Sequence, residues 1–213
     1  MAKVTLPLLG VRASGTVGKS IVFGNWKGIN YARQHAVPAN PRSTAQQAQR
    51  GLVQFTTSFW QRAPAAVQNS FIASAKGAAM TGFNLFTKRN LFSLRNKTNL
   101  NDIVLSGGQS GATGLASVTA SGGSGTITAS AVLADPIPGT TVTRVHFVAL
   151  RQAAPSGPYV YNPYWIADTT SPYSVTFTSL PAGQYVVSAF TECVESSGKT
   201  VYSVSLNTTA TVS

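Results

Sequence analysis

The chain has 213 residues, enough for one large domain or two ordinary ones. Charged residues make up 10% of it, against roughly 25% in an average globular protein, and hydrophobic residues make up 43%, a composition that excludes intrinsic disorder. No apolar run approaches the roughly 18 residues of a membrane span, and the N-terminal residues lack the apolar core of a signal peptide. We therefore expect a soluble, folded protein made inside the cell.

The charges are divided unevenly between the two halves of the chain. Residues 1–100 contain thirteen Lys and Arg and no Asp or Glu, whereas residues 101–213 contain three basic and five acidic residues. This division predicts two domains with different partners, at residues 1–99 and 100–213. We expect the basic domain to face nucleic acid or an acidic protein surface, because nothing inside it relieves the repulsion among its own charges.

Residues 15–35 are predicted to form a β-hairpin. Residues 24–28 supply glycine and asparagine for its turn, and they are flanked by segments with the alternation of a strand. The residues that define this alternation are Val17, Lys19, Ile21 and Phe23 before the turn, and Ile29, Tyr31 and Arg33 after it.

Three helices are predicted after the hairpin. Ser43 and Gln46 form a capping box at the start of the first helix. The second helix opens at Pro64 and ends at Gly77, and the third runs from about residue 81 to residue 94. Helical spacing predicts these buried faces: Ala45, Ala48, Leu52, Phe55 and Phe59 in the first helix, Val67, Phe71 and Ala75 in the second, and Phe83, Phe86 and Leu94 in the third.

After residue 99 the sequence changes to short segments rich in Val, Thr, Ser and Tyr, separated by Gly and Pro. This spacing predicts a β-sandwich. Residues 180–185 resemble the corner of immunoglobulin-like and fibronectin-like domains, in which a Tyr hydroxyl, here that of Tyr185, bonds to nearby backbone. The fold class is thus an α+β domain (hairpin plus three helices) followed by an immunoglobulin-like sandwich. The predicted strands are 114–120, 125–133, 141–151, 159–167, 173–179, 184–193 and 200–212.

The residue types needed for catalysis are sparse. Residues 13–20 fit a permissive phosphate-binding loop, but no buried strand precedes them and the residues that follow indicate a strand, not a helix. His146 is expected on the polar face of its strand, where it is solvated, and Cys193 is expected to be a small core thiol. No paired carboxylates or metal cluster are present. We therefore expect no enzyme activity, no catalytic or metal-binding residues and no cofactor.

Basic and aromatic residues alternate in the first domain, a pattern typical of proteins that bind single-stranded nucleic acid. A three-helix unit with basic flanks also suits duplex phosphates. The helix aromatics follow the 3.6-residue period, however, and core packing is the simpler explanation for them. The residues of this pattern are Phe23, Trp26, Lys27, Tyr31, Arg33, Trp60, Arg62, Phe86, Lys88 and Arg89.

Residues 10–95 resemble a family of structural proteins from tailed bacteriophages and prophages. The features that carry the resemblance are a hairpin with Gly18-Lys19, Trp26-Lys27-Gly28 and Arg33, then Pro38-x-Asn40-Pro41, Thr44-x-Gln46-Gln47-x-Gln49-Arg50, Trp60, and Thr81-Gly82-Phe83-Asn84-x-Phe86. The resemblance implies a virion protein made in the host cytoplasm. Immunoglobulin-like domains resembling residues 101–213 are also common on phage capsids and tails.

In this context the basic domain is expected to anchor the chain to the particle, and the sandwich to decorate or bridge subunits. Capsid decoration or a minor capsid role is favoured over a tail or connector role. The expected partners are major capsid or tail proteins and copies of the chain itself, with no membrane. The alternative is a nucleic-acid-binding protein packaged in or associated with the particle. The candidate anchoring residues are Lys19, Trp26, Lys27, Arg33, Arg42, Arg50 and Arg62.

Overall fold

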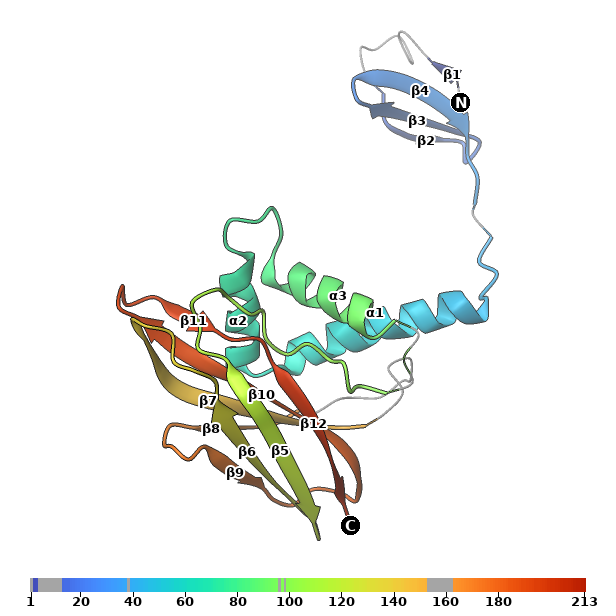
Figure 1. Cartoon of the computed structure of the whole chain (residues 1–213). Coiled ribbons are helices and arrows are strands. Elements are labelled where there is room, and N and C mark those ends of the chain that lie inside the picture. Colours follow the sequence, from blue (N-terminus) through green and yellow to red (C-terminus); the bar gives the residue numbers. More distant parts are fainter. Residues whose placement is uncertain (1, 4–12, 38, 96, 98, 153–162) are drawn as a thin grey trace. The chain divides into compact units, whose positions relative to one another are not determined.

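The computed structural model describes residues 2–3, 13–37, 39–95, 97, 99–152 and 163–213. It divides the chain into two compact units, which we call unit 1 (Met1–Arg42) and unit 2 (Ser43–Ser213). The described residues form three helices and three β-sheets, an α+β fold with a β-sandwich-like part (Figure 1). The elements are β1 (Ala2–Lys3), β2 (Gly15–Val17), β3 (Ile21–Trp26), β4 (Ile29–Gln34), α1 (Thr44–Arg62), α2 (Ala65–Ala75), α3 (Gly82–Ser93), β5 (Leu115–Gly123), β6 (Thr126–Leu133), β7 (Thr140–Arg151), β8 (Tyr164–Asp168), β9 (Ser174–Phe177), β10 (Gly183–Glu195), β11 (Thr200–Tyr202) and β12 (Leu206–Val212).

Unit 1 is a small antiparallel sheet in the order β1-β4-β3-β2. The predicted hairpin is present as the β3–β4 pair, with the turn confined to Lys27 and Gly28. Gly24 and Asn25, expected in the turn, lie inside β3 instead, where they pair with Tyr31 and Asn30. The pairing of β2 with β3 adds a second turn at residues 18–20, so that Lys19 lies in a turn and not in a strand.

In unit 2, a three-stranded sheet in the order β5-β6-β9 faces a five-stranded sheet in the order β11-β10-β7-β8, in which β12 also pairs with β10. The two sheets share one apolar core. Strands alternate their side chains between faces, so every second residue of β7 and β10 points into this core. Its members from these two strands are Val145, Phe147, Ala149, Tyr185, Val187 and Ala189, and those from the smaller sheet include Leu115, Ile127, Ala129, Val175 and Phe177.

The three helices cover the other face of the five-stranded sheet (Figure 1). The intervening residues of β7 and β10 point toward them, which explains why both strands are buried on both faces at their centres. A second core forms between the helices and the sheet. It includes Leu52, Phe55 and Phe59 of α1, Val67 and Phe71 of α2, Phe86 of α3, and Val148, Leu150, Val186 and Phe190 of the sheet.

The predicted helix faces are mostly confirmed. The three expected residues of α2 are buried, and so are Phe86 and Leu94 at α3. In α1, however, Ala45 and Ala48 are exposed, as are all residues of the first two turns of this helix. The caps are as expected: Ser43 Oγ accepts a hydrogen bond from Gln46 N at 3.4 Å, and Gly77 follows α2 with a φ of 86°.

The boundary between the compact units differs from the division at residues 99 and 100 that charge predicts. Residues 100–108 connect the helices to the sandwich without a break. Asn90 of α3 bonds to both backbone groups of Val104, each at 2.9 Å. Asn207 of β12 donates to Ile103 O at 2.8 Å, and Leu105 N donates to Ser205 Oγ at 3.2 Å. The helices therefore belong with the sandwich, because the sheet has a second apolar face that they cover.

The strand predictions are confirmed for the segments that the structure describes, except that residues 200–212 form two strands, β11 and β12. The start of the predicted strand 159–167 lies outside the described residues, and β8 begins at Tyr164. Tyr185 Oη donates to Pro181 O at 2.8 Å, the backbone tie expected at this corner.

His146 is an exception to the expectation of a solvated side chain. Only 1% of its surface is exposed, because its ring is stacked on Trp165 of β8 and packs against Phe190 of β10. Cys193 is buried, as a core thiol should be, with its Sγ 3.5 Å from Thr191 Oγ1.

Candidate anchoring surface

The tip of the β3–β4 hairpin is a two-residue turn. Lys27 and Gly28 have φ values of 50° and 81°, which is the pattern of a type I′ turn and the one that matches the twist of a hairpin. Asn25 stabilises the tip through two hydrogen bonds, since its Nδ2 donates to Asn30 Oδ1 at 2.8 Å and its Oδ1 accepts from Gly28 N at 3.2 Å. The turn thereby holds Trp26 at a defined position at the end of β3.

Trp26 is exposed over 66% of its surface. The ammonium group of Lys27 lies over its indole ring, 4.9 Å from the ring centroid, in a cation–π contact. Such a contact contributes about 0.5–1 kcal/mol at an exposed site. The hairpin tip therefore presents an aromatic ring and a positive charge together.

The register of β3 and β4 determines which side chains share a face with Trp26. Residues that pair across an antiparallel ladder lie on the same face. Tyr31 crosses Gly24 so closely that a Cβ at Gly24 would lie 2.6 Å from the tyrosine hydroxyl oxygen. Gly24 therefore provides the space in which the Tyr31 ring lies against the sheet. We call this surface the tryptophan face; its residues are Val22, Gly24, Trp26, Ile29, Tyr31 and Arg33.

The opposite face of the sheet carries a second apolar group. Ile21 and Phe23 of β3 share it with Val17 of β2, and Ile21 and Val17 are both exposed. Among residues 13–37 and 39–42, no side chain is buried. Apolar side chains are thus exposed on both faces of the described sheet: Val17 and Ile21 on this face, and Trp26 and Ile29 on the tryptophan face.

The structure brings only some of the predicted anchoring residues together. Lys27 lies over the Trp26 ring at the tip. Arg33 is exposed on the tryptophan face, but it pairs with Val22, four positions along the ladder from the tip. Lys19 is exposed in the turn at the other end of β3, with a φ of 54°, about 20 Å from the tip at about 3.3 Å per residue. Arg42 is the last residue of unit 1.

Arg50 and Arg62 belong to unit 2, where both are exposed on α1. Twelve residues separate them, which corresponds to about 18 Å along the helix and to a rotation of about 120° around it. They therefore lie on different sides of α1. Arg62 also donates to Ser58 O at 3.4 Å, a favourable position for a cation at a helix C-terminus.

Sequence reasoning missed two features. The sequence pattern predicts Gly24 in the turn, whereas the pairing that places it beneath Tyr31 depends on the register, which a single strand does not specify. Phe92 was not singled out, although it follows Lys88 and Arg89 at helical spacing and 87% of its surface is exposed.

The described residues 13–20 form β2 and a turn leading into β3, with no helix N-terminus at which a phosphate would bind. No group of three or more His, Cys, Asp or Glu side chains suited to a metal ion occurs in the part of the chain that the structure describes. No helix there combines the length and the apolar character needed to cross a membrane.

No protein-family model matches the chain, and no curated protein matches it. Among solved structures, it is similar to the fibronectin(III)-like modules of Clostridium thermocellum CbhA, with 24% sequence identity and a TM-score of 0.28. The match covers 46% of this chain and 46% of that one, so this chain spans less than half the length of the matched structure. A similarity of this size has no bearing on function.

Proposed function

We propose that this chain is a structural protein of a bacteriophage virion, in which unit 1 anchors it to an acidic protein surface of the particle. The observation that carries the proposal is the composition of unit 1: residues 1–42 contain six Lys and Arg and no acid, and their described part is a sheet without a buried side chain. The phage context comes from the resemblance of residues 10–95.

The tryptophan face has the chemistry of a protein interface. Trp, Tyr and Arg are the residues that most often dominate binding energy, and Trp26, Tyr31 and Arg33 share this face. Docking would cover the apolar groups that the sheet leaves in water. Because unit 1 has positive charges only, an acidic partner surface would accelerate association and disfavour other partners.

Unit 2 is proposed to be the part that decorates the particle or bridges its subunits. Its sandwich, with the Tyr185–Pro181 hydrogen bond at its corner, supports an immunoglobulin-like assignment. Residues 101–213 are nearly neutral and rich in Ser and Thr, which suits a domain that projects from a surface or contacts its own copies. Capsid decoration or a minor capsid role remains our preferred placement over the tail or the connector.

The proposal predicts that Trp26→Ala reduces incorporation into particles while the purified protein remains folded. Loss of a central interface aromatic typically costs about 2 kcal/mol or more, roughly a thirtyfold loss of affinity. Incorporation is measured by co-sedimentation with nuclease-treated particles and immunoblotting. The control is Val132→Ala, which shortens a side chain on β6 that is 60% exposed. Equal incorporation of both variants and the unaltered chain would remove the tryptophan face from the anchor.

The same experiment distinguishes anchoring to a protein surface from the alternative, in which the chain is a nucleic-acid-binding protein associated with the particle. Trp26, Lys27 and Tyr31 also suit a stacked base beside a phosphate. If association with particles disappears on nuclease treatment, nucleic acid and not a protein surface is the partner of unit 1.

A further inference from the structure

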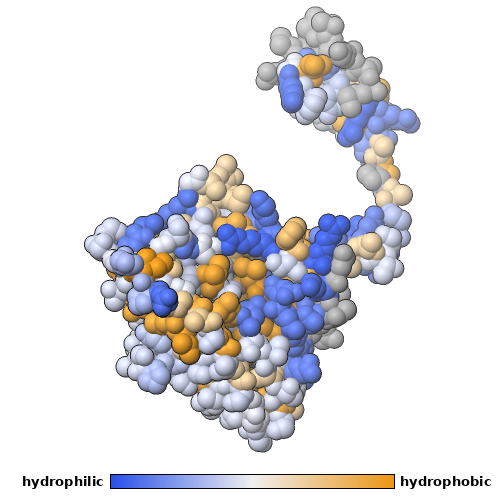
Figure 2. All heavy atoms as spheres, in the orientation of Figure 1, coloured by the Kyte–Doolittle hydropathy of each residue, from blue (hydrophilic) through white to orange (hydrophobic). Residues whose placement is uncertain are grey.

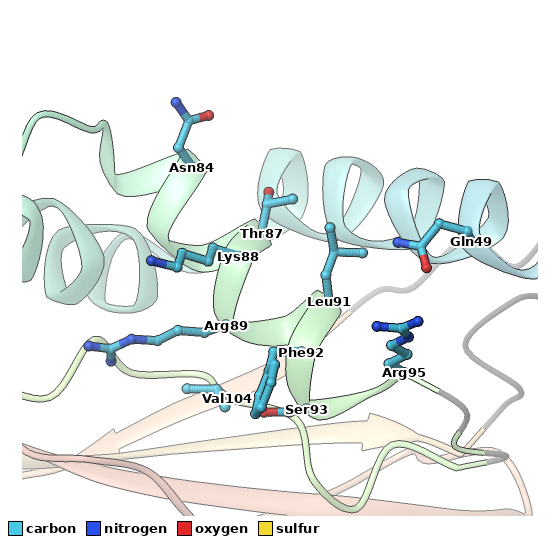
Figure 3. Close-up of a pocket in the computed structure, with 10 residues that line it drawn as sticks. All are labelled: Gln49, Asn84, Thr87, Lys88, Arg89, Leu91, Phe92, Ser93, Arg95 and Val104. Carbon is cyan, nitrogen blue, oxygen red and sulfur yellow. The ribbon is translucent and has the colours of Figure 1, made fainter.

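A surface groove of about 1130 Å³ lies in unit 2 along α3. Gln49 borders it from α1, and Val104 borders it from the segment that follows α3 (Figure 3). In the space-filling view, strongly hydrophilic and hydrophobic residues lie next to one another in this part of unit 2 (Figure 2). The other lining residues are Asn84, Thr87, Lys88, Arg89, Leu91, Phe92, Ser93 and Arg95.

Three cations lie close to Phe92 in the sequence, on α3 and just beyond it. Lys88 and Arg89 precede it by four and three residues on α3, and such residues are neighbours on a helix surface. Arg95 follows two residues after the helix ends at Ser93. Figure 3 shows the Phe92 ring between the side chains of Arg89 and Arg95. With 87% of its surface exposed, Phe92 contributes little to either core, and an exposed large apolar side chain is the informative exception on a protein surface.

The groove is positively charged and has no acidic counterpart. None of the salt bridges among the described residues involves Lys88, Arg89 or Arg95. Asp102 is the first acid in the chain, and it already pairs with Lys97 at 2.9 Å. The guanidinium of Arg89 donates to Gly107 O, which holds this cation against the groove.

Polar groups complete the lining. Thr87 Oγ1 is shielded from solvent and has no hydrogen-bond partner in the described structure. The amides of Gln49 and Asn84 supply both donors and acceptors at the rim. The exposed amides of Gln49 and Asn84 are of the kind that bond to base edges and sugar oxygens, whereas the shielded Thr87 Oγ1 is not open to a ligand.

We propose that this groove binds single-stranded nucleic acid, with a base stacked on Phe92 and the adjoining phosphates at Lys88, Arg89 and Arg95. Stacking on an exposed aromatic ring next to cations is how single strands are held without sequence preference. Cations alone would suffice for an acidic peptide, whereas the exposed ring between them matches the alternation of base and phosphate in a single strand. The inference concerns unit 2 and does not depend on the anchoring role of unit 1.

The test uses the full chain and a fluorescently labelled oligodeoxythymidine, with binding followed by fluorescence anisotropy at low salt. Phe92→Leu removes the flat ring but keeps an apolar side chain, and we expect it to weaken binding about tenfold. Phe92→Tyr retains the ring and should bind within about twofold of the unaltered chain. Because Phe92 is exposed, neither change should alter the folded state, which circular dichroism checks.

Charge variants distinguish the groove from general attraction to a basic protein. Lys88→Gln and Arg95→Gln should each weaken binding and reduce the slope of log K against log salt by about 0.7. Lys76→Gln, which removes one exposed cation near the end of α2, is the matched control and should change binding less.

Three results would overturn the inference: no anisotropy change at low salt, full binding by Phe92→Leu, or equal losses from Lys76→Gln and Lys88→Gln. Displacement of the oligonucleotide by a glutamate-rich peptide that Phe92→Leu binds equally well would assign the groove to acidic peptides instead.

Discussion

His146 shows how a polar residue is accommodated on a buried part of the five-stranded sheet. Trp165 Nε1 donates to His146 Nδ1 at 3.3 Å, so the ring proton lies on Nε2, which donates to Glu192 Oε2 at 2.7 Å. The ring packs against Phe190, with 5.1 Å between the ring centroids. Burial lowers the pKa of His146 from its usual 6.5, although Glu192 acts in the opposite direction, and the tautomer agrees with a neutral imidazole.

This environment predicts a pH dependence of stability. Because the pKa of His146 is lower in the folded than in the unfolded chain, the unfolded chain takes up a proton first as the pH falls below 6.5. The free energy of unfolding is therefore highest above pH 6.5 and decreases below it, by at most about 1.4 kcal/mol per pH unit for one proton. Denaturant unfolding measured from about pH 7.5 down to about pH 5 gives this slope, because histidine titrates within that range.

His146→Gln should flatten the pH dependence in this range, whereas His35→Gln, in unit 1, should leave that of unit 2 unchanged. Asp168 does not interfere, because backbone hydrogen bonds, first that from Thr170, lower the pKa of this carboxyl from its usual 3.8. The contribution of the Asp168 carboxylate to the free energy of unfolding is complete above pH 3.8 and is lost only below that pH. An unaltered slope in His146→Gln would contradict our assignment of the titrating group.

Strands β5 and β12 of the sandwich approach each other unusually closely near Ser213. Ser213 N donates to Gly123 O at 3.2 Å, and Gly125 N donates to Ser213 O at 3.3 Å. At Gly122 of β5, a Cβ would lie 1.7 Å from the carbonyl oxygen of Thr211 in β12. The absence of a side chain at this position allows β5 to pass over β12 and join the two sheets.

Gly122→Ala is therefore expected to lower the free energy of unfolding by about 2 kcal/mol or more, because backbone and not a flexible side chain must move. Gly114→Ala is the matched control, since a Cβ there would have no heavy atom within 4 Å, and its effect should stay within about 0.5 kcal/mol. Urea unfolding of both variants measures the difference, and equal stability of the two would show that β5 and β12 separate at little cost.

At the scale of the whole molecule, the sheet with two covered faces determines where the chain can be divided. Residues 43–213 contain both apolar cores, whereas a fragment beginning at residue 100 would expose the sheet face that the helices cover. That face includes Val148, Leu150, Val186 and Phe190.

We expect residues 43–213 to unfold cooperatively at a temperature close to that of unit 2 in the full chain. Residues 100–213 should instead aggregate or bind a hydrophobic dye, because an exposed apolar face of this kind is an association surface. Calorimetry and dye fluorescence make the comparison. A monomeric, cooperatively folded 100–213 fragment would show that the helices are dispensable to the sandwich.

Local sequence was sufficient to predict most elements of this protein. The cap at Ser43, the apolar face of α2 and the hydroxyl tie of Tyr185 depend on residues within a few positions of one another. Each of these features is determined by residue types that lie close together in the sequence. The same holds for the excess of basic residues in the first half of the chain.

Only the tertiary structure decided how those elements combine. Leu105 and Ser205 meet although about a hundred positions separate them in the chain, and such contacts place the helices on the sheet, bury His146 and leave Phe92 in water. The predicted anchoring residues are divided between two units for the same reason. Periodicity indicates that a face is apolar, but which partner covers it depends on packing between distant segments, and the local pattern carries no information about that choice.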